Sequence, residues 1–261
     1  MIGVFDSGVG GLTVLRELMK RLPGYSFVYF GDTARTPYGN KSPETIERYA
    51  REDTSLLLRE GAKLIVIACN TASALAGECL RKEFPVPVFD VIAPSVLRAA
   101  AETKSGRVGV IGTRATVGSG VYAERFRASF PNVEVFSESC PLFVPLVEEG
   151  WLGKRETKQI VRRSLAPLRR KNIDTLILGC THYPLLRSVI AERIGRRVRL
   201  VDPAAEVAET VVRYLGTYPE VAATIAHTAS IRLLVSDETP AFGKLATKIL
   251  GKPVVIEKTQ I

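Results

Sequence analysis

Runs of β-branched and other apolar residues alternate with segments of helical periodicity along the whole chain. The predicted strands are Ile2–Phe5, Ser26–Phe30, Leu64–Ala68, Val86–Val91, Arg107–Ile111, Glu134–Ser137, Thr175–Leu178, Val198–Val201 and Ile231–Val235. The predicted helices are Gly11–Leu22, Pro43–Glu60, Thr71–Phe84, Tyr122–Phe130, Lys154–Arg170, Pro184–Ile194, Ala204–Leu215 and Gly243–Leu250. This alternation is typical of βαβ units and predicts an α/β protein with mostly parallel, helix-covered sheets. Ligands of such sheets bind beyond the carboxyl ends of the strands.

Two strand ends occur twice in the chain. Gly3–Ser7 (GVFDS) resembles Gly109–Thr113 (GVIGT), and Ile65–Thr71 (IVIACNT) resembles Leu176–His182 (LILGCTH). The two displacements are similar, at 106 residues for the first pair and 111 for the second. We therefore predict two pseudo-symmetric α/β domains, with the site in the cleft between them.

The crossings between the two domains are expected at two segments. The first is Ala93–Ser105, which is rich in proline and then in alanine, and the second is Val201–Ala204. The predicted domains are accordingly 1–96 plus 207–261, and 97–206.

The net charge of +9 admits either a nucleic-acid surface or scattered solubilising charge. Basic groups such as Arg169–Lys171 flank predicted helices and are not interleaved with aromatic residues, which favours the second interpretation. No apolar run reaches the ~18 residues of a membrane span, and the N-terminus lacks the basic segment of a signal peptide. Four widely spaced cysteines fit reduced thiols in the cytoplasm better than disulfides.

Two of the cysteines stand at the repeated strand ends. Cys69 and Cys180 each follow a predicted strand and precede a loop that opens a helix. Helix N-termini favour a thiolate, so we expect both thiols to be activated and to face the cleft. Cys79, inside a predicted helix, and Cys140, in Ser-Cys-Pro, are predicted to be structural.

Several kinds of cysteine site fit the chain poorly. The cysteines form no C-x-x-C pair for a metal. A cysteine phosphatase needs arginine six positions after its nucleophile, where this chain has Leu75 and Leu186. A Cys–His hydrolase would leave one thiol without a role. Two thiols from two related halves instead suit a racemase, in which one group removes a proton from a carbon and the other returns a proton to the opposite face.

Other polar residues are predicted to share the cleft. Asp6 ends the first strand, and His182 lies two residues beyond Cys180, so each is a candidate partner for a thiol. Ser7–Gly11, Asn70–Thr71 and Thr181 open helices, where N–H groups and hydroxyls hold carboxylate or phosphate.

A dinucleotide site is the alternative for the first glycine-rich loop. Gly8 and Gly10 follow a strand, and Asp32 ends the next strand. Thr13 occupies the third glycine position, however, and Asp6 would face the pyrophosphate. Both features argue against this alternative.

Five segments together resemble the glutamate racemases of the aspartate/glutamate racemase family. They are Phe5–Gly11, Gly31–Gly39, Ala68–Ala72, Cys140–Glu149 and Gly179–Pro184. The resemblance implies two α/β domains facing a central site and cofactor-independent interconversion of L- and D-glutamate, which supplies D-glutamate for bacterial peptidoglycan. An aspartate racemase, which shares the fold and the thiol pair, is the nearest alternative.

The resemblance also implies roles for individual residues. Cys69 and Cys180 resemble the acid/base thiols, with Cys180 serving the L-isomer and Cys69 the D-isomer. Asp6 and His182 resemble their assisting partners, and Glu148 an acid near His182, with its neighbour Glu149 left open. The expected substrate contacts are Asp6, Ser7, Tyr38, Gly39, Asn70, Thr71, Thr181 and His182. We expect glutamate as the ligand, a homodimer, and no metal, cofactor, nucleic acid or membrane partner.

Overall fold

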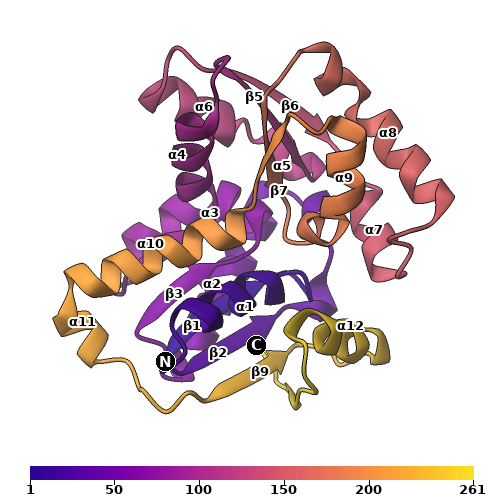
Figure 1. Cartoon of the computed structure of the whole chain (residues 1–261). Helices are drawn as coiled ribbons and strands as arrows, with labels where there is room; N and C mark the ends of the chain where they lie inside the picture. Colours follow the sequence, from indigo (N-terminus) through magenta and orange to yellow (C-terminus); the bar gives the residue numbers. More distant parts are fainter.

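Two parallel β-sheets, each covered by helices on both faces, form the protein (Figure 1); the computed structural model describes all residues 1–261. The first sheet has the strand order β10 (Ile256–Lys258), β9 (Ile231–Val235), β2 (Phe27–Gly31), β1 (Ile2–Asp6), β3 (Leu64–Ile67) and β4 (Val88–Asp90). The second sheet has the order β6 (Glu134–Ser139), β5 (Arg107–Gly112), β7 (Thr175–Gly179) and β8 (Arg199–Val201). The predicted α/β class with parallel sheets is confirmed.

Helices bury the apolar faces of both sheets. Those around the first sheet are α1 (Leu12–Arg21), α2 (Pro43–Arg59), α3 (Asn70–Glu83), α10 (Pro203–Thr217), α11 (Pro219–Ala223) and α12 (Pro240–Leu250). Those of the second half are α4 (Ile92–Glu102), α5 (Arg114–Gly118), α6 (Val121–Ser129), α7 (Phe143–Glu148), α8 (Arg155–Arg170) and α9 (Arg187–Ile194). Short 3-10 helices are η1 (Thr33–Arg35), η2 (Tyr38–Asn40) and η3 (Tyr183–Leu186). Helices α1, α10 and α12 share one core with the first sheet, and α2 and α3 share the other.

The two sheets share one strand order. In the first, β1 lies between β2 and β3, with β4 outside β3. In the second, β5 lies between β6 and β7, with β8 outside β7. The similar segments therefore end corresponding strands, β1 with β5 and β3 with β7. Because all these pairs are parallel, the similar ends lie at the carboxyl edge of each sheet.

The chain passes from the first sheet to the second through a helix. The segment predicted as a proline- and alanine-rich break, Ala93–Ser105, is mostly helix α4. Pro94 lies in the first turn of α4, where no intrahelical N–H bond is required, and the alanines favour helix. Val96 and Ala99 of this helix pack in one core with the second sheet. The chain returns through α10, and the domain boundaries at 96 and 206 stay a prediction.

Four further elements had no counterpart in the sequence patterns. They are β10, α5, α7 and α11, each of three to six residues and therefore too short for a clear periodicity. The helix predicted from Pro184 begins as η3 and becomes α-helical at Arg187. None of the helices combines the length and the apolar character needed to cross a bilayer.

Candidate active site

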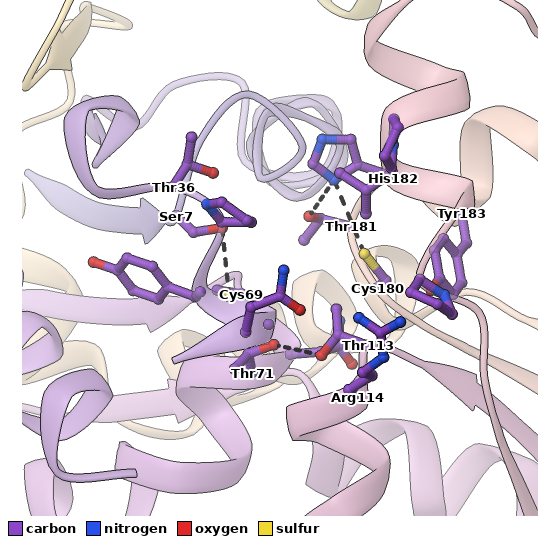
Figure 2. Close-up of a pocket in the computed structure, with 18 of the residues that line it drawn as sticks. Ser7, Thr36, Cys69, Thr71, Thr113, Arg114, Cys180, Thr181, His182 and Tyr183 are labelled. Atoms are coloured by element: carbon purple, nitrogen blue, oxygen red, sulfur yellow. Dashed lines mark hydrogen bonds between the residues drawn. The ribbon is translucent and has the colours of Figure 1, made fainter. Parts of the chain in front are cut away.

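A cavity of about 270 Å³ lies where the carboxyl edges of the two sheets meet (Figure 2). The residues one or two positions after β1, β3, β5 and β7 contribute to it, namely Ser7, Cys69, Thr113 and Cys180. The lining residues are Ser7, Thr36, Pro37, Tyr38, Gly39, Asn40, Cys69, Asn70, Thr71, Thr113, Arg114, Pro141, Leu142, Val144, Pro145, Glu148, Cys180, Thr181, His182 and Tyr183. Figure 2 shows Cys69 and Cys180 on opposite sides of this space. Cys79 and Cys140 do not line it.

Cys69 is the N-cap residue of α3 and is almost fully buried. Its Sγ donates to Ser7 Oγ at 3.9 Å. Burial, and after it the nearby charge of Asp6, raise the pKa of the Cys69 thiol to about 12. The helix N-terminus favours a thiolate at this residue, but loss of solvent and the Asp6 carboxylate act against it and outweigh it. Cys69 is a neutral thiol at rest.

Cys180 belongs to a chain of three polar groups. Its Sγ lies 3.9 Å from Nδ1 of His182, whose Nε2 lies 3.0 Å from Oε1 of Glu148. Burial lowers the pKa of His182, but its bonds to Cys180 and Glu148 more than offset this and raise the pKa to about 10. The imidazole is therefore a cation at neutral pH. Glu149, the neighbouring acid, does not line the cavity, so Glu148 is the acid beside His182.

Asp6 lies behind the cavity wall, without any exposed surface. Its Oδ2 accepts hydrogen bonds from the backbone N–H groups of Gly8 and Gly11, at 3.1 and 3.0 Å. Its Oδ1 accepts one from the Thr181 hydroxyl at 3.4 Å. Burial raises the pKa of Asp6, and the charge of His182 and these bonds oppose that rise. The carboxyl group thus orders the β1–α1 loop rather than facing the cavity.

Asn70 presents a hydrogen-bond donor without a partner. The Tyr122 hydroxyl donates to Asn70 Oδ1 at 2.8 Å, which fixes the amide. The Nδ2 group is buried and has no acceptor within the protein. A buried, unpaired donor costs free energy unless a ligand or water accepts from it. Asn70 is therefore ready to bind an anionic oxygen.

The two halves contact each other at hydroxyls and glycines around the cavity. Thr71 Oγ1 lies 2.9 Å from Oγ1 of Thr113, which follows β5 of the other sheet. A Cβ on Gly39 would lie 2.7 Å from Cβ of Thr113, and a Cβ on Gly10 would lie 2.3 Å from Oγ1 of Thr181. Only glycine permits these approaches.

The sequence reasoning missed several lining residues. Thr113 could have been predicted, because it corresponds to Ser7 in the repeated strand ends. Arg114, beside it, places a cation at the cavity. Tyr122 does not line the cavity but fixes Asn70 of the other half, and no local pattern in the sequence indicates that contact. An apolar wall comes from Pro141, Leu142, Val144 and Pro145.

Comparison with known proteins identifies the family. The model of the Asp/Glu/Hydantoin racemase family matches residues 5–211, which is most of the chain. The protein belongs to this family. A glutamate racemase of Geobacter metallireducens is 50% identical over 250 residues, covering 96% of this chain and 92% of its own length.

Solved structures agree with this assignment. A glutamate racemase isoform from Bacillus anthracis is 35% identical, with a TM-score of 0.94, and the match covers 100% of this chain and 97% of that one. The Francisella tularensis glutamate racemase in complex with D-glutamate is 36% identical, with a TM-score of 0.91 and coverage of 100% and 96%. An aspartate racemase from Picrophilus torridus is 20% identical, with a TM-score of 0.53, and shows a shared fold alone.

Proposed function

We propose that this family member is a glutamate racemase that interconverts L- and D-glutamate without a cofactor and supplies D-glutamate for peptidoglycan. The observation that carries the proposal is the pair of cysteines, one from each half, on opposite sides of one cavity. The choice of glutamate is supported by the relatives and solved structures that match nearly the whole chain, which are glutamate racemases.

The two thiols are proposed to differ in their surroundings. The imidazolium of His182 lies beside the sulfur of Cys180, and a cation at this place stabilises the thiolate that a base needs during the reaction. Burial and the charge of Asp6, by contrast, keep the proton on Cys69. This combination suits L-glutamate if Cys180 serves that isomer, because His182 stabilises negative charge on the abstracting sulfur and Cys69 carries the proton to be delivered.

The reaction then proceeds by proton transfer at one carbon. The Cys180 thiolate takes the α-proton, the Cα–H bond breaks, and its electron pair delocalises into the α-carboxylate. The S–H bond of Cys69 breaks and a new Cα–H bond forms on the opposite face. The reverse reaction exchanges the two roles, so D-glutamate needs Cys69 as thiolate and Cys180 as thiol. Hydrogen-bond donors that already point at the developing negative charge lower the barrier.

Those donors come from both sheets. We assign the substrate carboxylates to Asn70 Nδ2, to the hydroxyls of Thr71 and Thr181, and to groups of Ser7 and Gly39. Arg114 adds a cation that attracts the carboxylates of an anionic substrate to the cavity. Asp6 is proposed to assist Cys69 from behind the wall. A homodimer and a cytoplasmic location stay predictions.

The test replaces each thiol in turn. Cys69→Ala and Cys180→Ala should each abolish racemisation in both directions, followed by polarimetry. Cys79→Ala, which alters a cysteine outside the cavity, should keep wild-type turnover. Near-normal turnover in either cavity variant would contradict the two-thiol mechanism, and faster turnover of aspartate than of glutamate would overturn the substrate assignment.

A further inference from the structure

A buried polar cluster lies beneath the loop that carries Tyr38. The Tyr38 hydroxyl lies 2.5 Å from Oδ2 of Asp32 and 2.9 Å from Oδ2 of Asp53. Neither aspartate has exposed surface, and Tyr38 is 1% exposed. Arg35 is the one cation in the cluster and contacts Asp32, Asp53 and Glu52. Two acids therefore contact a single phenol, and the third, Glu52, contacts the arginine.

If both aspartates were ionised, the Tyr38 hydroxyl would have one proton for two hydrogen-bond contacts. A tyrosine hydroxyl carries one hydrogen and donates it to one acceptor. Two ionised carboxylates at hydrogen-bond distance from the same hydroxyl would leave one of these contacts as oxygen against oxygen with no proton between them. A buried contact of that kind is unfavourable, so one of the two carboxyl groups has to be the donor.

The contacts of each aspartate decide which one holds the proton. Both oxygens of Asp32 face donors: Oδ2 accepts from Arg35 Nε at 2.6 Å, and Oδ1 accepts from the Ser236 hydroxyl at 2.9 Å. Oδ1 of Asp53 accepts from Arg35 Nη2 at 2.9 Å, but its Oδ2 contacts Tyr38 alone. A proton on Asp53 Oδ2 completes the network, because Asp53 then donates to Tyr38 and Tyr38 donates to Asp32.

We propose that Asp53 is a neutral carboxylic acid at neutral pH and that, through Tyr38, it positions the substrate loop at Thr36–Asn40. Burial and the charge of Asp32 raise the pKa of Asp53 well above its usual range, which agrees with the hydrogen-bond pattern. Tyr38 and its neighbour Gly39 line the cavity, and Gly39 packs closely on Thr113 of the other half. Asp53 itself does not reach the cavity, so it is a positioning residue.

Two isosteric variants separate the neutral acid from the ionised one. In Asp53→Asn, the amide N–H₂ donates to Tyr38 and the amide oxygen accepts from Arg35, so KM for glutamate should stay within about twofold of wild type. In Asp32→Asn, a group that accepts from Arg35, Tyr38 and Ser236 loses its charge, so KM should rise by about tenfold, with a smaller change in kcat. An equal rise in KM for both variants would overturn the proposal.

The proton also has readouts that do not depend on the proposed glutamate racemisation. Infrared difference spectra of wild type minus Asp53→Asn at pH 7 should show the carbonyl band of a protonated carboxyl group. Unfolded Asp53 loses its proton near pH ~4, whereas the folded protein keeps it, so wild-type stability decreases above that pH. Asp53→Asn has no carboxyl group at this position, so its stability does not decrease in this way. The difference in Tm between Asp53→Asn and wild type should therefore grow as pH rises from about 4 to about 7.

The groups that face Asp53 are Asp32, Glu52, Arg35 and Tyr38, and all remain in the variant. Absence of the carbonyl band, together with a Tm difference that does not change with pH, would show that Asp53 is ionised and would refute the inference. The proposed function could fail while these two measurements still succeed, so the two failures are distinguishable.

Discussion

Glu148→Gln should shift the alkaline fall of kcat/KM to lower pH, while kcat/KM at neutral pH stays close to wild type. Glu148 accepts from His182 at 3.0 Å and is one cause of the raised His182 pKa of about 10. A hydrogen bond to a charged group contributes ~1.5–3 kcal/mol. The Glu148 side chain is 43% exposed, so solvent screening reduces the effect to about 1.4 kcal/mol. That is roughly one pKa unit, which predicts a His182 pKa near ~9 in the variant.

The assay is the pH dependence of kcat/KM, which reports groups of the free enzyme. Above its pKa, His182 is neutral and no longer stabilises the negative charge that proton abstraction requires on the Cys180 sulfur, so kcat/KM should fall. The equilibrium constant of a racemisation is one, so either enantiomer gives the same profile. Glu149→Gln, the matched control outside the cavity, should leave the limb in place. An unshifted limb in Glu148→Gln would refute the assigned role of the Glu148–His182 bond.

Three further predictions test separate parts of the site. Tyr122→Phe removes the donor that fixes Asn70, and KM for glutamate should rise about five- to tenfold, whereas Tyr25→Phe, whose ring packs on His227, should not alter it. Gly10→Ala places a Cβ 2.3 Å from Thr181 Oγ1 and should lower kcat/KM by at least about tenfold, whereas Gly216→Ala, where a Cβ meets no atom within 4 Å, should keep full activity. Limiting iodoacetamide at neutral pH should alkylate Cys180 before Cys69, because the His182 imidazolium lies beside the Cys180 sulfur whereas the Cys69 pKa is about 12; peptide mass mapping with Cys69 modified first would contradict this difference between the thiols.

The repeated strand ends predicted much of this architecture from sequence. They located corresponding strands in two sheets of the same order and brought Cys69 and Cys180 to one cavity. Parallel strands place their carboxyl ends at one edge, so local similarity carried information about distant structure. The helix over the predicted crossing segment was not predicted, because a proline in the first turn of a helix looks the same in sequence as a proline in a linker.

The electrostatics of the site lay beyond sequence reasoning. The helix at Cys69 was visible in the pattern, but the depth of burial and the approach of Asp6 from a neighbouring strand were not, and they decide the protonation state of the thiol. The choice between Glu148 and Glu149 likewise depends on where the short helix α7 ends. Contacts between residues far apart in the chain, such as Tyr122 with Asn70, leave no local signal.

Isotope incorporation from solvent tests the central claim, that two thiols act on opposite faces of one carbon. Each enantiomer of glutamate is incubated with the wild-type enzyme in deuterium oxide, and both isomers are separated at low conversion. We expect deuterium at Cα of the product and none in the recovered substrate, because the abstracting thiol and the delivering thiol are different groups. A product that keeps the substrate's own proton, or early label in the recovered substrate, would contradict it.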